Sequence, residues 1–284
     1  MVVLPHRPKQ KAFTTPAAAA AAAGVHHRRL VPAPLPQKLA ADHLAVRRRD
    51  PFALRDHADD VVATHAEYIA AGATVIETWN YSVTSHWLRG QPHLANKPEA
   101  EIQRELADLT KQSVRLAKQA RDECDAPHVL IAGTLPPLGA SFDADEPIDL
   151  LTAEPVDMQA AYTAMAAALD EEGCDLFLIE TCARISVAQA AVAACRSVNP
   201  SKKVWLAMTL HDKEPVLWSG ETIAELVATF EDSALHPAMK FDSQPDAVLF
   251  NCSPPEVVHA ALLELRPIFA GQTGGYANRR GGAV

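Results

Sequence analysis

Polar residues able to do chemistry stand at the ends of several short apolar runs of this chain. Glu180 ends one run, where a carboxylate can bind a substrate ammonium or act as a base. Cys252 ends another, just before a proline-rich helix start whose dipole favours the thiolate, the form that binds metal or attacks. Thr78 and Asn80 end a third run and can hydrogen-bond a polar substrate. These side chains predict a site for a polar, charged substrate.

Each of these residues also has a structural interpretation, which the sequence leaves open. Glu180 is equally interpretable as a carboxylate paired with a lysine or arginine, and Cys252 as a small buried apolar residue. Thr78 and Asn80 can cap a turn at a strand end. The histidines show no metal-ligand spacing and are interpreted as surface or core residues; they include His65, His86, His93, His211 and His259.

The apolar runs alternate with helix-length segments, and this order predicts how the site is positioned. Five strands are expected near residues 74–80, 128–134, 175–181, 203–209 and 247–252. Helices are expected at 56–71, 98–124, 157–172, 185–197 and 221–233. A final helix is expected to open with a capping box at residues 253–256 and to continue to about residue 265. Such alternation indicates a parallel sheet buried on both faces. Functional groups at the carboxyl ends of parallel strands are typical of a (β/α)8 TIM-type barrel.

The barrel pattern weakens towards both ends of the chain. A closed barrel of this type has eight strands, whereas the sequence indicates five, with residues 267–270 as a candidate sixth. At the front only residues 31–35 are apolar, and prolines interrupt them. We therefore expect an α/β fold that is an incomplete TIM-type barrel, with its first and last strands missing or degenerate.

Composition excludes several classes of function. The formal net charge of −9 argues against a nucleic-acid partner, which would need clustered lysine and arginine. No apolar stretch approaches the ~20 residues of a membrane span. The five cysteines are irregularly spaced without a CxxC pair, which is typical of core thiols in a reducing compartment. The phosphate-binding and hydrolase motifs GxxxxGK[ST], GxGxxG, GxSxG and HExxH are absent from the sequence.

The first 41 residues differ from the rest. They contain no aspartate or glutamate, carry basic residues and include an alanine run at 17–23. Such a segment is interpreted either as an organelle transit peptide or as a disordered extension. The expected organisation is thus an extension over 1–41 and a barrel domain over 42–284, in a cytoplasmic protein with organellar import as the alternative.

Five segments in order make the chain resemble the homocysteine S-methyltransferase family. Residues 68–73 leading to 76–81 (YIAAGA…IETWNY) resemble the family's "AGAD…TNTY" segment, and 133–137 (GTLPP) resembles its third-strand loop. Glu180 and Thr181 resemble its fourth-strand "ET". Residues 250–254 (FNCSP) resemble its "NC" zinc segment, and 276–279 (YANR) resembles its "YPN" segment. The resemblance covers about residues 42–280.

The resemblance implies a homocysteine-binding barrel that transfers a methyl group to the homocysteine thiol to give methionine. It implies zinc held by three cysteines, which lowers the pKa of the bound thiol. Carried over to this sequence, Cys252 is a zinc ligand, and Thr78 and Glu180 bind the amino-acid portion of homocysteine. The methyl donor implied is a small molecule such as S-methylmethionine.

The chain departs from the family pattern at both ends. The family's Gly-Gly-Cys-Cys segment, which supplies two zinc ligands, is replaced by Gly281-Gly282-Ala283-Val284, and its first-strand "DGG" segment is absent. One cysteine cannot form a three-thiolate site; Cys182 is the one other cysteine expected beyond a strand end. The alternative function is therefore a catalytically inactive or vestigial barrel. A barrel aldolase is disfavoured because no run ends in a Schiff-base lysine.

Overall fold

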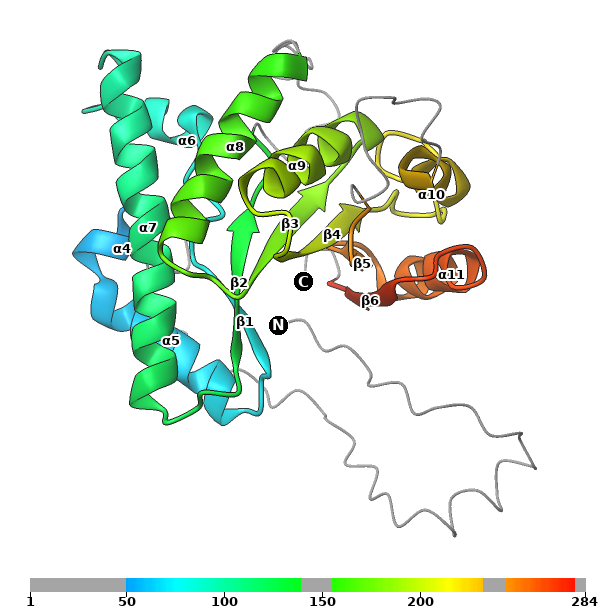
Figure 1. Cartoon of the computed structure of the whole chain (residues 1–284), viewed down its shortest axis with the longest axis horizontal. Coiled ribbons are helices and arrows are strands. Elements are labelled where there is room, and N and C mark those ends of the chain that lie inside the picture. Colours follow the sequence, from blue (N-terminus) through cyan, green and yellow to red (C-terminus); the bar gives the residue numbers. More distant parts are fainter. Residues whose placement is uncertain (1–49, 139–154, 232–243, 279–284) are drawn as a thin grey trace, which may run out of the picture.

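The computed structural model describes residues 50–138, 155–231 and 244–278. A six-stranded sheet with all neighbours parallel and in chain order forms its centre (Figure 1). The strands are β1 (Val75–Glu77), β2 (Leu130–Leu135), β3 (Leu176–Cys182), β4 (Lys203–Thr209), β5 (Ala247–Asn251) and β6 (Gln272–Tyr276). The predicted extension over 1–41, and residues 42–49 of the predicted barrel domain, lie outside the described residues.

Helices pack along the outer side of the sheet, as expected for strands that alternate with helices. They are α4 (Ala53–Asp56), α5 (Ala58–Ala70), α6 (Ser85–Arg89), α7 (Glu99–Glu123), α8 (Pro155–Glu171), α9 (Ile185–Val198), α10 (Ile223–Glu231) and α11 (Pro255–Leu265). Gly72 follows α5 with φ of 94° and Gly173 follows α8 with φ of 72°, a left-handed conformation that glycine adopts without steric cost. The sequence predicted both glycines as helix stops.

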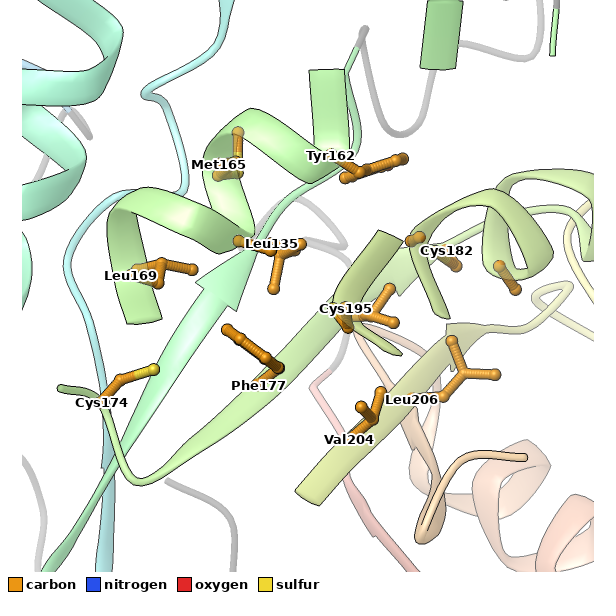
Figure 2. Packing of buried hydrophobic residues seen from close by; sticks show 14 of the residues in the cluster. Leu135, Tyr162, Met165, Leu169, Cys174, Phe177, Cys182, Cys195, Val204 and Leu206 are labelled. Carbon is orange, nitrogen blue, oxygen red and sulfur yellow. The ribbon is translucent and has the colours of Figure 1, made fainter. Parts of the chain in front are cut away.

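The two faces of the sheet bury different side chains. On the outer face, Leu135, Phe177 and Leu206 face the helices, in the same layer as Tyr162 and Cys195 from α8 and α9 (Figure 2). The inner face carries a separate apolar cluster made of Val75, Ala132, Leu176, Leu178, Trp205, Ala207, Ala247 and Leu249. Burial on both faces explains why these strands are continuous apolar runs. The result is a curled half-barrel, consistent with an incomplete TIM-type barrel.

The predicted strands are confirmed at five places, and the predicted sixth is wrong. Residues 267–270 form the turn that ends α11, where the Ile268 and Phe269 N–H groups both donate to the Leu265 carbonyl. The sixth strand is β6, which carries Gly274 and Gly275 and so lacks an apolar run. A Cβ on Gly275 would lie 2.9 Å from the Phe250 carbonyl oxygen, so close strand packing requires glycine there.

The predicted capping box at the start of α11 is also wrong. The N-cap is Pro254, because a residue that precedes a proline avoids the helical region, and Pro255 then begins the helix. The Ser253 hydroxyl instead donates to the Asn251 carbonyl at 2.7 Å and accepts from the Leu210 N–H at 2.8 Å. Ser253 therefore ties the end of β4 to the end of β5. The short helices α4 and α6 were not predicted.

Candidate functional site

Polar side chains replace apolar ones where the inner face of the sheet reaches the carboxyl ends of its strands. Residues two positions apart in a strand face the same side of the sheet. The residues two positions after Val75, Leu178 and Leu249 of the inner apolar cluster therefore face the same side and belong to this polar layer. Thr209, Asn251 and Tyr276 are in register across β4, β5 and β6. The layer consists of Glu77, Thr134, Glu180, Thr209, Asn251 and Tyr276.

A pocket of about 210 Å³ opens at this polar layer. Three of the four residues singled out from the sequence, Thr78, Glu180 and Cys252, line it, although they come from three different strand ends. The other lining residues are Asp50, Pro51, Glu77, Trp79, Tyr81 and Ser82. This volume is below the roughly 300–1,000 Å³ of pockets for drug-sized ligands, so the site suits small molecules.

Glu180 lies almost fully buried at the centre of the site, with 7% of its surface exposed. Its Oε1 accepts a hydrogen bond from the Tyr276 hydroxyl at 3.2 Å and one from the Asn251 amide at 3.3 Å. Burial raises the pKa of Tyr276 well above its usual value, and the nearby Glu180 carboxylate raises it further. The phenol therefore stays protonated and donates to the carboxylate.

A β-bulge at the end of β3 shapes the site next to Glu180. The register with β4 shifts between Ile179 and Cys182, and Thr181 has φ of 57°. A β-branched residue at positive φ is a backbone outlier, and such strain concentrates at functional sites. Cys252 at the end of β5 has φ of 50°. The two strained residues touch, with 3.8 Å between the Thr181 hydroxyl and the Cys252 sulfur.

The Thr181 hydroxyl connects Asn251 to Cys252. Its oxygen accepts from the Asn251 amide at 2.8 Å, and it lies within hydrogen-bond distance of the Cys252 sulfur, where either group can be the donor. Cys252 is partly exposed to the pocket, so its sulfur is accessible to a small ligand.

Thr78 and Asn80 are held by a local network, as their structural interpretation proposed. The Thr78 hydroxyl accepts from the Thr134 N–H at 2.9 Å and donates to the Asn80 side-chain oxygen at 2.7 Å. The Asn80 amide donates to the Thr134 carbonyl at 2.9 Å. Asn80 is fully buried and does not line the pocket, whereas Thr78 lines it and keeps one lone pair to accept from a ligand.

The remaining cysteines lie away from the pocket. All five cysteines of the sequence fall within the described ranges, and only Cys252 is among the residues that line the pocket. Cys174, Cys182 and Cys195 are buried in the layer between sheet and helices (Figure 2), where burial raises the pKa of Cys174 to about 11 and of Cys182 to about 12. The expectation that Cys182 lies beyond its strand end is wrong, since it is the last residue of β3 and pairs with Met208.

No set of three histidine, cysteine, aspartate or glutamate side chains that could hold a metal ion occurs among residues 50–138, 155–231 and 244–278. Glu77, Trp79, Tyr81 and Thr181 were given no role from the sequence, although all four belong to segments that resemble the family. Glu77 carries the same signal as Glu180, a carboxylate at the end of an apolar run. The role of Thr181 depends on a backbone bulge that residue patterns do not indicate.

Comparison with known proteins decides the family. The model of the homocysteine S-methyltransferase family matches residues 29–283. This chain belongs to that family. Among curated relatives, it is 27% identical over 223 residues to the selenocysteine methyltransferase of Astragalus bisulcatus, covering 72% of this chain and 62% of the relative. It is 27% identical over 217 residues to homocysteine S-methyltransferase 3 of Zea mays, covering 72% of this chain and 59% of that protein.

Solved structures agree with the family's fold. The metallated form of the homocysteine methyltransferase MmuM from Escherichia coli superposes with a TM-score of 0.63 at 24% identity, covering 84% of this chain and 76% of that one. The oxidised form gives 0.64 at 25% identity with the same coverage. The chain spans about three-fifths of the length of the curated relatives that it matches. Within its described part, no helix of this family member is long and apolar enough to cross a membrane.

Proposed function

We propose that this family member transfers a methyl group to the thiol of homocysteine, giving methionine, in the pocket at the carboxyl ends of β1, β3 and β5. The observation that carries the proposal is the convergence of Glu180 and Cys252 at one pocket, joined by a single hydrogen-bonded network through Asn251 and Thr181. The network places the buried carboxylate of Glu180 near the Cys252 sulfur on the pocket wall. An amino acid with a thiol side chain complements both features.

Glu180 binds the ammonium group of the substrate in this proposal. A charge-assisted hydrogen bond to ammonium is stronger than the neutral hydrogen bonds that the Glu180 carboxylate accepts from Asn251 and Tyr276. Thr78 accepts a further hydrogen bond from the same ligand, because its own proton is committed to Asn80. Homocysteine would then extend its thiol towards Cys252 and Thr181.

The reaction requires the homocysteine thiol to lose its proton to solvent before it attacks the methyl carbon. The new sulfur–carbon bond forms as the methyl bond to the donor breaks, and the electron pair of that bond stays on the donor atom. An unperturbed thiol has a pKa of about 8.5, so only a few per cent is thiolate near pH 7. In a pocket that supplies no further activation, turnover is slow at neutral pH and rises towards pH 9.

Zinc, which the family resemblance implies, does not fit the residues that line this pocket. A three-thiolate zinc site needs two sulfurs besides Cys252, and none of the other four cysteines lines the pocket: Cys124 follows α7, and Cys174, Cys182 and Cys195 are buried in the outer layer. We therefore assign no step to zinc. We expect the chain to bind zinc substoichiometrically and with weaker affinity than a three-thiolate site.

A second candidate is a barrel that binds homocysteine without methylating it. The single sulfur at the pocket favours this candidate, because nothing else on the lining lowers the pKa of a bound thiol. For both candidates we propose a cytoplasmic location, with organellar import as the alternative, because the irregular cysteine spacing without a CxxC pair is typical of a reducing compartment.

Isothermal titration of the full chain with homocysteine tests the proposed site. Glu180→Gln keeps the shape but removes the charge, and we expect about 30-fold weaker homocysteine binding, equivalent to about 2 kcal/mol for a hydrogen bond to a charged group. Glu264→Gln on the exposed side of α11 makes the same change of net charge and serves as the control. Equal affinities of the two variants would refute the assignment of Glu180.

A further inference from the structure

Trp79 and Glu77 separate two cavities of the molecule. On one side lies the pocket of about 210 Å³ at the carboxyl ends of the strands. On the other side lies a cavity of about 90 Å³ between α5 and β1. Trp79 and Glu77 line both, so these two residues form the partition between them. The other residues that line the α5–β1 cavity are Thr64, His65, Tyr68, Val75 and Ile76.

Several contacts hold Trp79 in place. His65 on α5 meets the indole edge-on, with 6.5 Å between the ring centroids. The residues on either side of it, Thr78 and Asn80, bond to each other at 2.7 Å and to Thr134 of β2. The indole also packs against the main apolar core. A ligand in the pocket therefore meets Trp79 as a fixed wall, because displacing the indole would break these contacts.

The α5–β1 cavity is lined by two buried polar atoms that no described residue satisfies. They are the Nε2 of His65, a side chain with 3% of its surface exposed, and the Oε2 of Glu77. Buried polar atoms are normally hydrogen-bonded, and leaving one unpaired is costly. A carboxylate oxygen only accepts hydrogen bonds. The cavity therefore suits a small group that ends in a hydrogen-bond donor.

A ligand bound as in the proposed function directs any group on its sulfur towards the partition. Glu180 ends β3 and Cys252 follows β5, and they hold the amino-acid end and the sulfur in that proposal. Strand β1 lies at one edge of the sheet, two strands from β3 and four from β5. The described lining beyond Glu180 and Cys252 consists of residues 50–51 and of residues at the end of β1, Trp79 among them. A longer substituent on the sulfur therefore runs into this wall.

We propose that Trp79 is a specificity-determining residue, which limits the size of the group on the substrate sulfur by closing off the α5–β1 cavity. The inference rests on the proposed function, because Glu180 and Cys252 orient the ligand. A close-fitting apolar wall discriminates by about 10- to 200-fold for one methylene group. Replacing the indole by a small side chain joins the two cavities, and the preference for the shorter group is then lost.

The polar atoms of the α5–β1 cavity predict which longer group gains most. A molecule of liquid water takes up about 30 Å³, so a cavity of about 90 Å³ has room for about three atoms of that size. A 2-aminoethyl group matches this size and ends in an ammonium, which forms a charge-assisted hydrogen bond with the Glu77 carboxylate. An ethyl group is shorter and donates no hydrogen bond. Once the indole is removed, the aminoethyl ligand should therefore bind more tightly than the ethyl ligand.

Calorimetry on the full chain tests the size limit with methionine, ethionine and S-(2-aminoethyl)homocysteine, which share one amino-acid end. We expect the unmodified chain to bind methionine at least tenfold more tightly than either of the others. Trp79→Ala should bind the aminoethyl ligand at least tenfold more tightly than the unmodified chain does, and Trp79→Phe should show part of this gain. Adding Glu77→Gln to Trp79→Ala should remove the advantage of the aminoethyl over the ethyl ligand. Trp87→Ala is the matched control, because Trp87 on α6 is 42% exposed and does not line the pocket.

Two outcomes would overturn the inference. One is equal binding of methionine and ethionine to the unmodified chain, a result that needs no variant to fold. The other is a Trp79→Ala variant that is folded by thermal unfolding and keeps the preference of the unmodified chain. A chain that methylates homocysteine but binds methionine and ethionine equally would refute the size limit and leave the proposed function standing. A size preference that depends on Trp79, without any methyl transfer, would uphold the size limit and refute the proposed function, so the two failures are distinguishable.

Discussion

His65 links the stability of the pocket wall to pH. It lies on α5 behind Trp79, with 3% of its surface exposed, and its Nε2 has no hydrogen-bond partner among the described residues. A small cavity of about 90 Å³ lies between His65, Trp79 and Glu77. Burial lowers the pKa of the His65 imidazole from 6.5 to about 4, because the charged form would be desolvated.

The sign and size of the effect follow from this shift. Between pH 6.5 and pH 4 the unfolded chain binds a proton that the folded chain does not, so the free energy of unfolding falls as the pH drops through this window. At 1.36 kcal/mol for each pKa unit, the full loss below pH 4 is about 3 kcal/mol. Between pH 7.5 and pH 5 we expect about 2 kcal/mol of this loss. The stability that depends on the neutral His65 imidazole is fully present above pH 6.5.

Urea unfolding at pH 7.5 and pH 5 measures this dependence. His65→Phe keeps an aromatic ring against Trp79 but cannot be protonated. Between pH 7.5 and pH 5 we expect the free energy of unfolding of the variant to fall by about 2 kcal/mol less than that of the unmodified chain, because the two proteins share every other titrating group. Identical losses in the two proteins would refute the argument that burial of the His65 imidazole controls this stability.

Three further predictions concern the site and its support. Thr181→Val should lower the free energy of unfolding by about 1–3 kcal/mol, because the buried Asn251 amide loses its 2.8 Å acceptor, and Thr181→Ser should restore most of it in urea unfolding. Limiting iodoacetamide at pH 8 should alkylate Cys252 before Cys174, because burial raises the pKa of the Cys174 thiol to about 11. Saturating homocysteine should protect Cys252 from alkylation. Peptide mass spectrometry measures the order in which the two cysteines react. Gly133→Ala should destabilise by about 1–3 kcal/mol, since its Cβ would lie 2.9 Å from the Cys174 sulfur, and an unchanged melting temperature would contradict this packing.

The parallel strands and the meeting of Glu180 and Cys252 at one edge of the sheet could be predicted from the sequence, because both follow from simple alternation. Apolar runs that are buried on both faces identify the strands, and parallel order brings their carboxyl ends to one edge. Glu180 and Cys252 are therefore found at one pocket although they are far apart in the chain. Strand β6 was not predicted, because Gly274 and Gly275 stand where an apolar run would be expected, and close strand packing requires the glycine at position 275.

Features that depend on backbone geometry could not be predicted. The bulge at Thr181 puts a β-branched residue at positive φ, against its intrinsic preference, and residue patterns carry no sign of it. Ser253 resembles a helix cap in the sequence, but two following prolines move the helix start and release its hydroxyl to join two strands.

The measurement that tests the central claim most directly is methyl transfer from S-methylmethionine with deuterated methyl groups to homocysteine, followed by mass spectrometry of the methionine formed. The account predicts labelled methionine from the unmodified chain, with a rate that rises between pH 7 and pH 9 as the thiol ionises, and a large loss of rate in Glu180→Gln but not in Glu264→Gln. The pH window follows from the unperturbed thiol pKa of about 8.5. Homocysteine that binds the chain yet yields no labelled methionine at any pH, also with glycine betaine as the labelled donor, would contradict methyl transfer and establish the non-catalytic alternative.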